Sequence, residues 1–336
     1  MRIATFLSLV CLSLWSHAQV MHDLYEMSVV VADQSTAQRQ QATQEAMQLM
    51  LIKVSGSSDV LQHSDVQNAV VRPERYVRSF RYRRDEGNGD RLWMHVVFAP
   101  NLVDDLLRGA EQPIWGRNRS RVLVWLAQEE NGLREPISTN HPAKQLPMLE
   151  AMTERGLPLL WPILDLEDTF ALPLERLWGL FQQDIQHASL RYQPDAVLAG
   201  RLYQELDGRW VFRGVFEHQQ QWLGVDGEGE DRLIVMRQVA DQVARFLSDR
   251  YALRSMPGLT EGHRIDVSGI ETFEQYQQLL RYLSANNAIG NVHVVHIAQG
   301  QVSLALELTS EWARIWLNLA RDGRLRAIEE GVYQWL

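Results

Sequence analysis

Three carboxylates at the end of one short stretch are the residues of this sequence best placed to do chemistry. Residues 156–169 read GLPLLWPILDLEDT, so Asp165, Glu167 and Asp168 follow an apolar run that contains Trp161. Two neighbouring carboxyl groups act as general acid and general base when their surroundings separate their pKa values. Three of them also supply oxygen ligands for a divalent cation. Since tryptophan stacks on sugar rings, the stretch fits a hydrolase or a glycan-acting enzyme.

The same carboxylates have a structural interpretation, which the surrounding pattern favours. Asp165, Glu167, Asp168 and Thr169 stand just before a segment with helical character. Acidic residues at such a position accept hydrogen bonds from free backbone N–H groups and interact favourably with the helix dipole. A calcium loop needs further oxygen ligands at regular spacing and usually a glycine, and the stretch has neither. We therefore expect the trio to cap a helix, with catalysis by the trio as the alternative.

The sequence gives little support for any other catalytic site or for a metal site. The sequence has no G-x-S-x-G, no Walker loop, no H-E-x-x-H and no dinucleotide fingerprint. His293 and His296 lie at an odd offset on one expected strand, so they face opposite sides and share a metal only if the strand is bulged. The single cysteine, Cys11, lies in the N-terminal leader described next, which leaves no thiol for catalysis. We expect neither a metal nor a cofactor.

The first 18 residues have the pattern of a secretory signal peptide. Met1 and Arg2 give a short basic start, residues 3–15 are apolar and uncharged, and Ser16 and Ala18 place small residues at the −3 and −1 positions of a cleavage site. The apolar run is shorter than the roughly 20 residues that cross a bilayer. We therefore expect export to a bacterial periplasm, cleavage after the leader, and no transmembrane segment in the mature chain.

Composition and charge narrow the class of partner. Apolar residues make up 46% and charged residues 22% of the chain, which is ordinary for a globular protein and too apolar for a disordered one. The formal charge is −9, and it becomes −10 once Arg2 is removed with the leader. Nucleic-acid binding needs clustered cations, so an acidic chain is a poor candidate for it. We expect a protein partner in the cell envelope and no nucleic acid.

The segment after the leader, residues 19–116, combines a strand, a helix and a hairpin. A β-rich run at 24–31 precedes apolar residues at helical spacing, and Gly56 is expected to end that helix in the left-handed conformation. Residues 76–82 and 92–98 alternate with period two on either side of a glycine-containing turn. This alternation predicts an antiparallel hairpin.

Two further segments repeat this order of elements. In the second, residues 121–126 are apolar on both faces, as in a central strand, and Asp207-Gly208 marks a hairpin. In the third, an amphipathic helix precedes another clear hairpin. Each unit should be a small two-layer α/β sandwich with helices on one face of a mostly antiparallel sheet, so the expected fold class is α+β. The predicted organisation is a signal peptide and three α/β units, at 1–18, 19–116, 117–255 and 256–336.

Candidate binding residues come from irregular segments and from one basic strand. Trp115 and Trp161 lie outside the regular strand and helix patterns, and exposed tryptophans are frequent anchors of protein interfaces. Arg78 and Arg81 share an expected strand with two more arginines, so this strand is basic in an acidic protein. A solvated sheet face paired with neighbouring acids explains the strand as well, and it is the interpretation that we favour.

Four motifs in the second segment are specific enough to suggest a family. They are GLPLLWPILDLED at 156–168, LWG at 177–179, ASLRY at 188–192 and DAVLAGRL at 195–202. With them the chain resembles a family of exported proteobacterial proteins, the domain-of-unknown-function 2066 family, and the third segment has the helix-then-hairpin pattern of that family. The resemblance implies no activity, cofactor or catalytic residue. A weaker fold-level similarity to the amino-terminal domain of the Tol-system propeller protein and to curli-secretion lipoproteins implies envelope assembly work.

Together these features predict a non-enzymatic interaction or assembly module of the bacterial cell envelope. The alternative is an envelope hydrolase or glycan-acting enzyme that uses Asp165, Glu167 and Asp168. The two hypotheses differ in a structural requirement. An enzyme needs the trio to converge on a pocket, whereas an assembly module needs it only at a helix start, with exposed apolar surface elsewhere.

Overall fold

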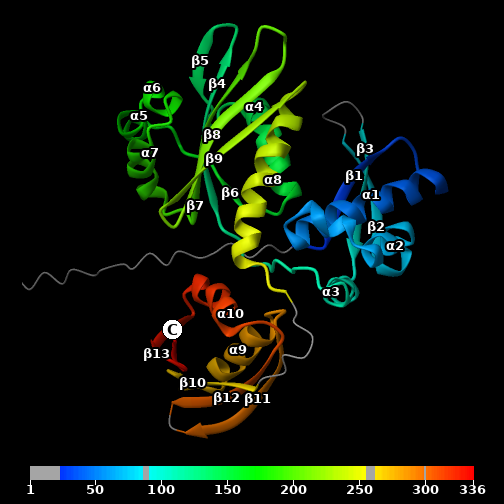
Figure 1. The fold of residues 1–336 in the computed structure, drawn as a ribbon, viewed down its shortest axis with the longest axis vertical. Helices are drawn as coiled ribbons and strands as arrows, with labels where there is room; N and C mark the ends of the chain where they lie inside the picture. The colour runs from blue at the N-terminus through cyan, green and yellow to red at the C-terminus, as the bar shows by residue number, and fades with distance from the viewer. Residues whose placement is uncertain (1–22, 86–90, 255–261, 299) are drawn as a thin grey trace, which may run out of the picture.

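Three β-sheets, each with its own helices, make up the described part of the chain (Figure 1). The predicted signal peptide lies outside the described residues. The sheets have three, six and five strands, and most strand pairs are antiparallel, so the predicted α+β class is confirmed. Each sheet falls within one of the three predicted units, whose boundaries stay predictions. The computed structural model describes residues 23–85, 91–254, 262–298 and 300–336.

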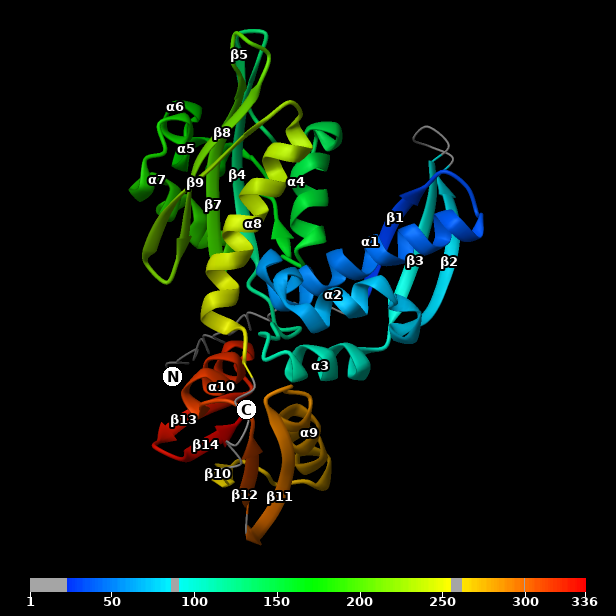
Figure 2. The ribbon, with the colours of Figure 1, turned by 45° about the vertical axis from the view of Figure 1, so that its right-hand side comes forward.

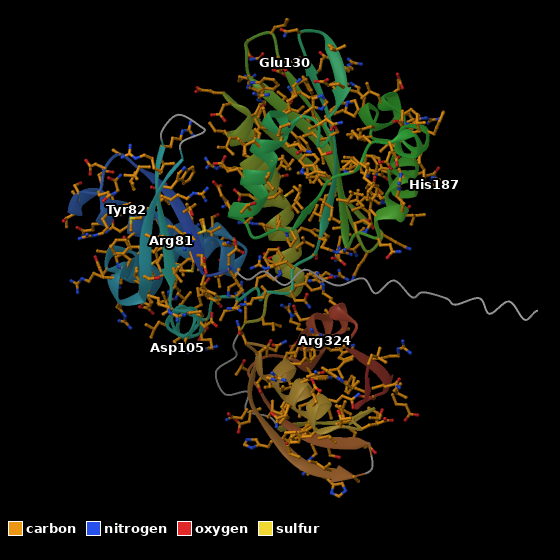
Figure 3. All side chains as sticks on the ribbon, turned by 180° about the vertical axis from the view of Figure 1, so that it is seen from behind. Arg81, Tyr82, Asp105, Glu130, His187 and Arg324 are labelled. Carbon is orange, nitrogen blue, oxygen red and sulfur yellow. The ribbon has the colours of Figure 1, made fainter. Side chains whose placement is uncertain are left out.

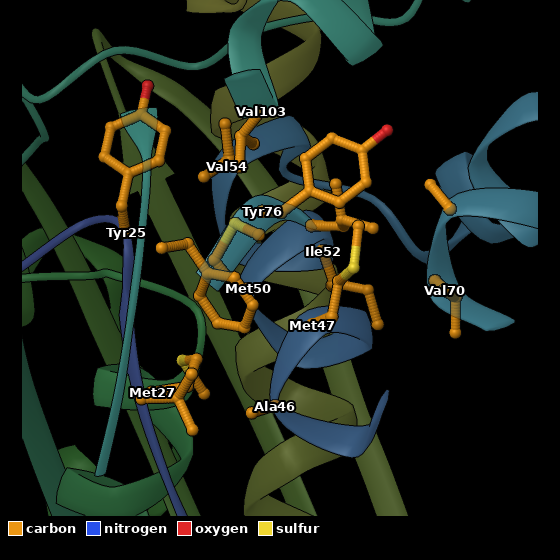
Figure 4. Packing of buried hydrophobic residues seen from close by; sticks show 14 of the residues in the cluster. Tyr25, Met27, Ala46, Met47, Met50, Ile52, Val54, Val70, Tyr76 and Val103 are labelled. Carbon is orange, nitrogen blue, oxygen red and sulfur yellow. The ribbon is translucent and has the colours of Figure 1, made fainter. Parts of the chain in front are cut away.

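The first unit is a three-stranded antiparallel sheet with helices packed on one face. Its elements are β1 (Glu26–Val31), α1 (Thr36–Ser55), η1 (Ser58–Gln62), α2 (Ser64–Val71), η2 (Pro73–Tyr76), β2 (Val77–Asp85), β3 (Arg91–Phe98) and α3 (Pro100–Gly109). The strand order is β1-β3-β2, with Val29 opposite Met94. Met47 and Met50 of α1 lie in the core of this unit together with Tyr76 (Figure 4). Alternation along β1 and β3 therefore directs one face of the sheet to α1.

The second unit is built on a six-stranded sheet. Its elements are β4 (Val122–Glu130), β5 (Leu133–Pro136), α4 (Pro142–Glu154), β6 (Leu159–Leu160), α5 (Leu166–Ala171), α6 (Leu174–Trp178), α7 (Gln182–Ser189), η3 (Leu190–Tyr192), β7 (Ala196–Gln204), β8 (Trp210–His218), β9 (Gln221–Gly229) and α8 (Arg232–Tyr251). The strand order is β5-β4-β7-β8-β9, and β6 pairs with β4. β4 pairs in parallel with β6 and β7, and the remaining pairs are antiparallel.

Helices cover both faces of this second sheet (Figure 1). Val122 and Val124 of β4 share a core with α4 and α8. Leu123 and Trp125 share a separate core with the side of the sheet that α5, α6 and α7 cover. The strand predicted to be apolar on both faces is thus buried on both. Because both faces need cover, the unit has three layers, one more than the two-layer sandwich of its neighbours.

The third unit returns to two layers. Its elements are β10 (Gly262–Ser268), α9 (Phe273–Ser284), β11 (Ile289–Ala298), β12 (Gln301–Leu308), α10 (Trp312–Leu319), η4 (Ala320–Asp322), β13 (Leu325–Glu329) and β14 (Val332–Trp335). The strand order is β11-β12-β10-β14-β13. Leu279 of α9 and Ile315 of α10 pack with Leu304 and Leu306 in one core. Across the ranges that the structure describes, no helix is long and apolar enough to cross a membrane.

A buried arginine ties the first unit to the second. The Arg119 side chain is fully buried, and its Nη2 donates hydrogen bonds to the backbone carbonyls of Lys53 (2.9 Å) and Trp115 (2.6 Å). Its Nε donates to the carbonyl of Gly116 (2.7 Å), and its Nη1 donates to that of Arg155 (3.4 Å). A buried cation is costly unless its hydrogen-bonding capacity is met. Carbonyls from α1, from the segment that connects α3 to β4, and from the end of α4 meet the hydrogen-bonding capacity of Arg119.

The segment that connects α3 to β4 also forms hydrogen bonds with the third unit. Arg321 donates hydrogen bonds from Nη1 to the carbonyl of Asn118 (3.0 Å) and from Nη2 to the hydroxyl of Ser120 (3.0 Å). The Asn118 side-chain amide donates in turn to the carbonyl of Asn318 (3.3 Å). Figure 2 shows α10 beside the lower end of α8, and the two helices are in contact. The three units therefore meet around one short segment.

One glycine sets how closely the first two units approach. Gly56 ends α1 with a φ of 85°, and its N–H donates to the carbonyl of Ile52 (2.7 Å), so the predicted left-handed C-cap is confirmed. A Cβ atom added to Gly56 would lie 2.1 Å from the Cβ of Ser248 on α8. The Ser248 hydroxyl donates to the carbonyl of Gly56 (3.3 Å). Only a residue without a side chain fits between α1 and α8 here.

We expect Gly56→Ala to lower the free energy of unfolding by more than 2 kcal/mol, because backbone strain of about 1 kcal/mol adds to the clash with Ser248. Gly132 is the matched control, since its φ is 79° and an added Cβ would have no neighbour within 4 Å. Gly132→Ala should therefore cost only the strain. The measurement is the thermal unfolding midpoint by circular dichroism. Equal losses in the two variants would mean that the close approach to α8 contributes nothing.

His218 is a buried titratable group with a predictable effect on stability. Its Nδ1 lies 2.8 Å from the Asp195 carbonyl and its Nε2 lies 2.6 Å from the Tyr251 hydroxyl. Burial lowers the pKa of the imidazole below its ordinary value. Because the folded state disfavours the proton, the stability that His218 contributes is present above about pH 6.5 and is lost as the pH falls.

We expect the unfolding midpoint to fall between pH 7 and pH 5, and His218→Gln to reduce that fall. Some pH dependence should remain, because burial also lowers the pKa of His263. The exposed His187, labelled in Figure 3, supplies the control variant His187→Gln. Melting curves at a series of pH values make the measurement. A wild-type slope in His218→Gln would show that this imidazole is not the group that titrates.

Candidate functional site

The three carboxylates of the opening stretch lie at the start of α5. The Asp165 carboxylate is the N-cap, and its Oδ1 accepts a hydrogen bond from the Asp168 backbone N–H (3.0 Å). Asp168 is buried, and its Oδ2 accepts from the Leu164 backbone N–H (2.8 Å). Glu167 stands in the first turn with its side chain mostly exposed. The helix-capping prediction is confirmed for Asp165.

An arginine and a tyrosine from η3 close this group, which we name the ion cluster and define as Asp165, Glu167, Asp168, Arg191 and Tyr192. The Arg191 guanidinium binds both carboxylate oxygens of Asp165 (2.8 and 3.1 Å) and Oδ1 of Asp168 (2.9 Å). The Tyr192 hydroxyl donates to Oδ2 of Asp168 and accepts from the Ile163 backbone N–H (2.9 Å). Two segments distant in sequence are thereby held together by charge-assisted hydrogen bonds.

The electrostatics of the ion cluster are those of a structural contact. Hydrogen bonds from Arg191 lower the pKa of Asp165, and the same contact raises the pKa of Arg191. Burial, followed by the hydrogen bond to Asp168, raises the pKa of Tyr192 to about 12. A general acid needs a carboxyl pKa raised toward the working pH, which is the opposite of what Arg191 does to Asp165. The carboxylates of Asp165 and Asp168 also already accept hydrogen bonds from protein groups.

Four large apolar side chains that are near the ion cluster in sequence are exposed to solvent. We name them the apolar lip and define them as Ile163, Leu166, Phe170 and Leu190, whose exposed fractions are 62%, 76%, 82% and 67%. Leu166 and Phe170 are one turn apart on α5, so they share a face of the helix. Sequence reasoning missed the lip. Its signal was present as the i, i+4 apolar pair beside the acidic trio, but a short apolar pair is equally typical of a core.

The two tryptophans proposed for surface contact have other positions. Trp115 is fully buried under the Arg119 guanidinium, whose Cζ lies 3.6 Å from the centre of the ring, so the prediction that it is a surface residue is wrong. The irregular segment that contains it is the junction between units, and the junction is packed. Trp161 is half-buried against the core that β4 shares with α4 and α8. A role of Trp161 in binding stays a prediction.

The basic strand proposed for binding is β2, at one edge of the first sheet. Arg78 and Arg81 are exposed there, and Figure 3 labels Arg81 beside Tyr82 on this strand. Arg81 lies opposite His95 of β3. Within the described ranges, no acidic side chain forms a salt bridge with Arg78 or Arg81. The two arginines therefore lie on a solvated sheet face, as the favoured interpretation expects, but without the pairing to neighbouring acids, and they stay candidate binding residues.

The structure brings the two strand histidines onto one face, contrary to the alternation expected from sequence. The register of β11 against β12 shifts between Val294 and His296, so Val295 is an extra residue in a bulge. His293 and His296 both lie on the face of the sheet that α9 and α10 leave open. A carboxylate, Glu307, lies 3.3 Å from His293. Within the described part of the chain, no three His, Cys, Asp or Glu residues are grouped to hold a metal ion.

A cavity of about 520 Å³ lies where the three units meet, and none of the ion cluster lines it. Its walls include Asp59 of the first unit, Arg245 and Asp249 of α8, and Arg314 of α10. Arg245 donates hydrogen bonds to both carboxylate oxygens of Asp59 (2.9 and 3.0 Å). The cavity is thus a polar seam between units, and the carboxylate trio of the opening stretch is distant from it in the fold.

Comparison with known proteins finds a family model that matches the first unit alone. A family model described as a domain of unknown function, DUF8605, matches residues 18–116. It replaces the 2066 family suggested by the motifs of the second unit, and that identification is wrong. No curated protein matches the chain. Five chains of solved structures match, among them one described as the crystal structure of an uncharacterized protein, at 12% identity over 39% of this chain and 88% of that chain, with a TM-score of 0.17.

We expect Asp168→Asn to lower the free energy of unfolding by about 2 kcal/mol, because the buried group loses its charge-assisted contacts with Arg191 and Tyr192. Glu167→Gln is the matched control, since Glu167 is mostly exposed and its contact with Arg191 is longer, at 3.5 Å. It should change stability by less than about 0.5 kcal/mol. Thermal melting of the three proteins makes the comparison. Carboxylates kept for catalysis repel one another, so an unchanged or higher midpoint in Asp168→Asn would argue against a structural role.

Proposed function

We propose that this protein is a non-enzymatic interaction or assembly module of the bacterial cell envelope, and that it acts in the periplasm after removal of its leader. The observation that carries the proposal is the apolar lip near the ion cluster. Scattered exposed apolar residues are normal on any protein surface. Four large side chains, each more than three-fifths exposed and each within two residues of the ion cluster or one turn along α5, are typical of an interaction site.

The ion cluster supports a binding role because it fixes the lip before a partner arrives. α5 has six residues, and a helix of that length is not stable by itself. Asp165 caps the helix, and Arg191 and Tyr192 join it to η3. A rigid apolar surface loses little conformational freedom on binding, which favours affinity.

The charges beside the lip favour a particular chemistry in the partner. Asp165, Glu167 and Asp168 stand against the single cation Arg191, which gives the cluster a formal charge of −2. Because charges at the rim of an interface steer association and select partners, a segment with apolar anchors and flanking basic residues fits best. The N-terminal pattern of residues 1–18 supports a partner in the envelope, since such leaders direct export.

Site-specific photo-crosslinking in living cells tests this function. A photoreactive phenylalanine analogue is placed at Phe170 in the exported protein, and at Leu133 as the control. Leu133 is exposed to a similar degree, at 68%, and is the first residue of β5. We expect one discrete adduct from position 170 and none of that mass from position 133.

The variant Leu166→Glu should remove the adduct. It should change the free energy of unfolding by no more than about 0.5 kcal/mol, because an exposed side chain contributes little to folding. Equal export of all variants is checked by immunoblot. Identical adducts from both positions, or no adduct from position 170 in well-exported protein, would refute the lip as a binding surface.

A further inference from the structure

One edge strand of the third unit lacks the features that usually prevent edge-to-edge pairing. Edge strands present unpaired backbone N–H and C=O groups, and proteins protect them with charged side chains, proline or covering elements. β11 reads IGNVHVVHIA and contains no Asp, Glu, Lys, Arg or Pro. Apart from β6, a strand of two residues that pairs with β4 alone, the other edge strands of the three described sheets each carry charge: Glu26 in β1, four arginines in β2, Arg134 and Glu135 in β5, Asp226 and Glu228 in β9, and Arg326 and Glu329 in β13.

The side chains of β11 are also unusually exposed for an apolar strand. Val294, Val295 and Ile297 are all exposed, although Val294 and Ile297 lie opposite buried residues of β12. α9 packs on the sheet next to β11 but leaves this end of the strand uncovered. In Figure 2 the C-terminal end of β11 lies at the bottom of the third unit, away from the other two units. The edge is therefore both apolar and accessible.

The sequence of this edge is complementary to itself. Residues 292–297 read VHVVHI, which is the same in both directions except for Val at one end and Ile at the other. Two antiparallel copies centred on this segment would place Val294 opposite Val295 and His293 opposite His296 of the second copy. Val292 would lie opposite Ile297. Each pair joins side chains of matching type, which is the arrangement that stabilises neighbouring strands.

The bulge at Val295 makes this pairing geometrically consistent. Two strands related by a two-fold axis perpendicular to the sheet keep their faces, so opposite residues must lie on the same face. In a regular strand His293 and His296 would face opposite sides, because their offset is odd. The extra residue Val295 restores the match, since both histidines lie on the open face, and Val292 and Ile297 both lie on the face toward the core.

We propose that two copies of this chain associate through β11, antiparallel and in this register, to form one continuous ten-stranded sheet. The contact is isologous, and in it the free backbone edge of β11 is paired in both copies. Growth stops there, because the remaining edge of the sheet, β13, carries Arg326 and Glu329. In this register residues 291–298 of the two copies pair, and a segment of about eight residues spans roughly 26 Å, which is a small interface. The dimer should therefore form reversibly at micromolar concentrations.

Sedimentation velocity of the mature chain from about 1 to 500 μM tests the association. We expect a monomer–dimer equilibrium in the wild type. Val295→Lys should weaken it at least tenfold, because two like charges, one from each copy, would lie close together near the two-fold axis. The matched control is Ile328→Lys on β13, at the other edge of the same sheet, since Val295 and Ile328 are 52% and 53% exposed. Ile328→Lys should dimerise like the wild type.

Cysteine crosslinking tests the register independently of any loss of affinity. The mature chain has no cysteine, so His293→Cys and His296→Cys each introduce a single thiol. In the proposed register the two positions lie directly opposite each other, whereas equivalent positions are about 10 Å apart, beyond disulfide reach. A mixture of the two variants should therefore oxidise to a crosslinked dimer much faster than either variant alone.

Three results would overturn the proposal. They are a monomer at every concentration, a dimer that Val295→Lys leaves unchanged, and crosslinking of the mixture no faster than that of the single variants. Melting curves of Val295→Lys and Ile328→Lys show that both variants are folded. The lip of the second unit takes no part in these measurements, so either proposal can fail without the other.

Discussion

The arrangement of the three units depends on one buried cation that has no carboxylate partner. Within the described residues, no acidic side chain forms a salt bridge with Arg119, although its side chain is fully buried. Its acceptors are backbone carbonyls, and two of them, at Lys53 and Arg155, belong to the C-terminal ends of α1 and α4. Helix C-termini carry partial negative charge, so two helix ends take the place of the missing carboxylate. Neither helix end could move away without leaving a buried charge unsatisfied.

This constraint decides which face of the middle sheet is free for other contacts. α4 and α8, on one face, make the contacts to the first and third units through Arg155, Ser248 and the end of α8. α5, α6 and α7 cover the opposite face, which looks away from the junction (Figure 1). The second helical layer thus separates the side that holds the protein together from the side that carries the apolar lip. A two-layer unit would have had no such outer layer.

Local pattern in the sequence predicted the elements well, and long-range packing much less well. β4 is apolar at every position along most of its length, and the Gly56 C-cap follows a helical repeat, so both could be read from neighbouring residues. The burial of Trp115 and Arg119 could not, because it depends on helix ends more than thirty residues away in the sequence. Likewise, nothing in the spacing of His293 and His296 reveals that Val295 bulges. Periodicity assumes regular geometry, and a bulge breaks it.

The carboxylate trio shows why residue types alone suggested an enzyme. Acidic residues beside an apolar run are what a hydrolytic site would need, but they are also what a six-residue helix with an exposed apolar face needs. Leu166 and Phe170 gain nothing from burial in the free protein, so α5 must be held by other means. Asp165 supplies the cap, and Asp168 supplies the buried anchor for Arg191 and Tyr192. The carboxylates and the apolar residues therefore form one device, in which ionic contacts inside the cluster keep the apolar lip in place at the surface.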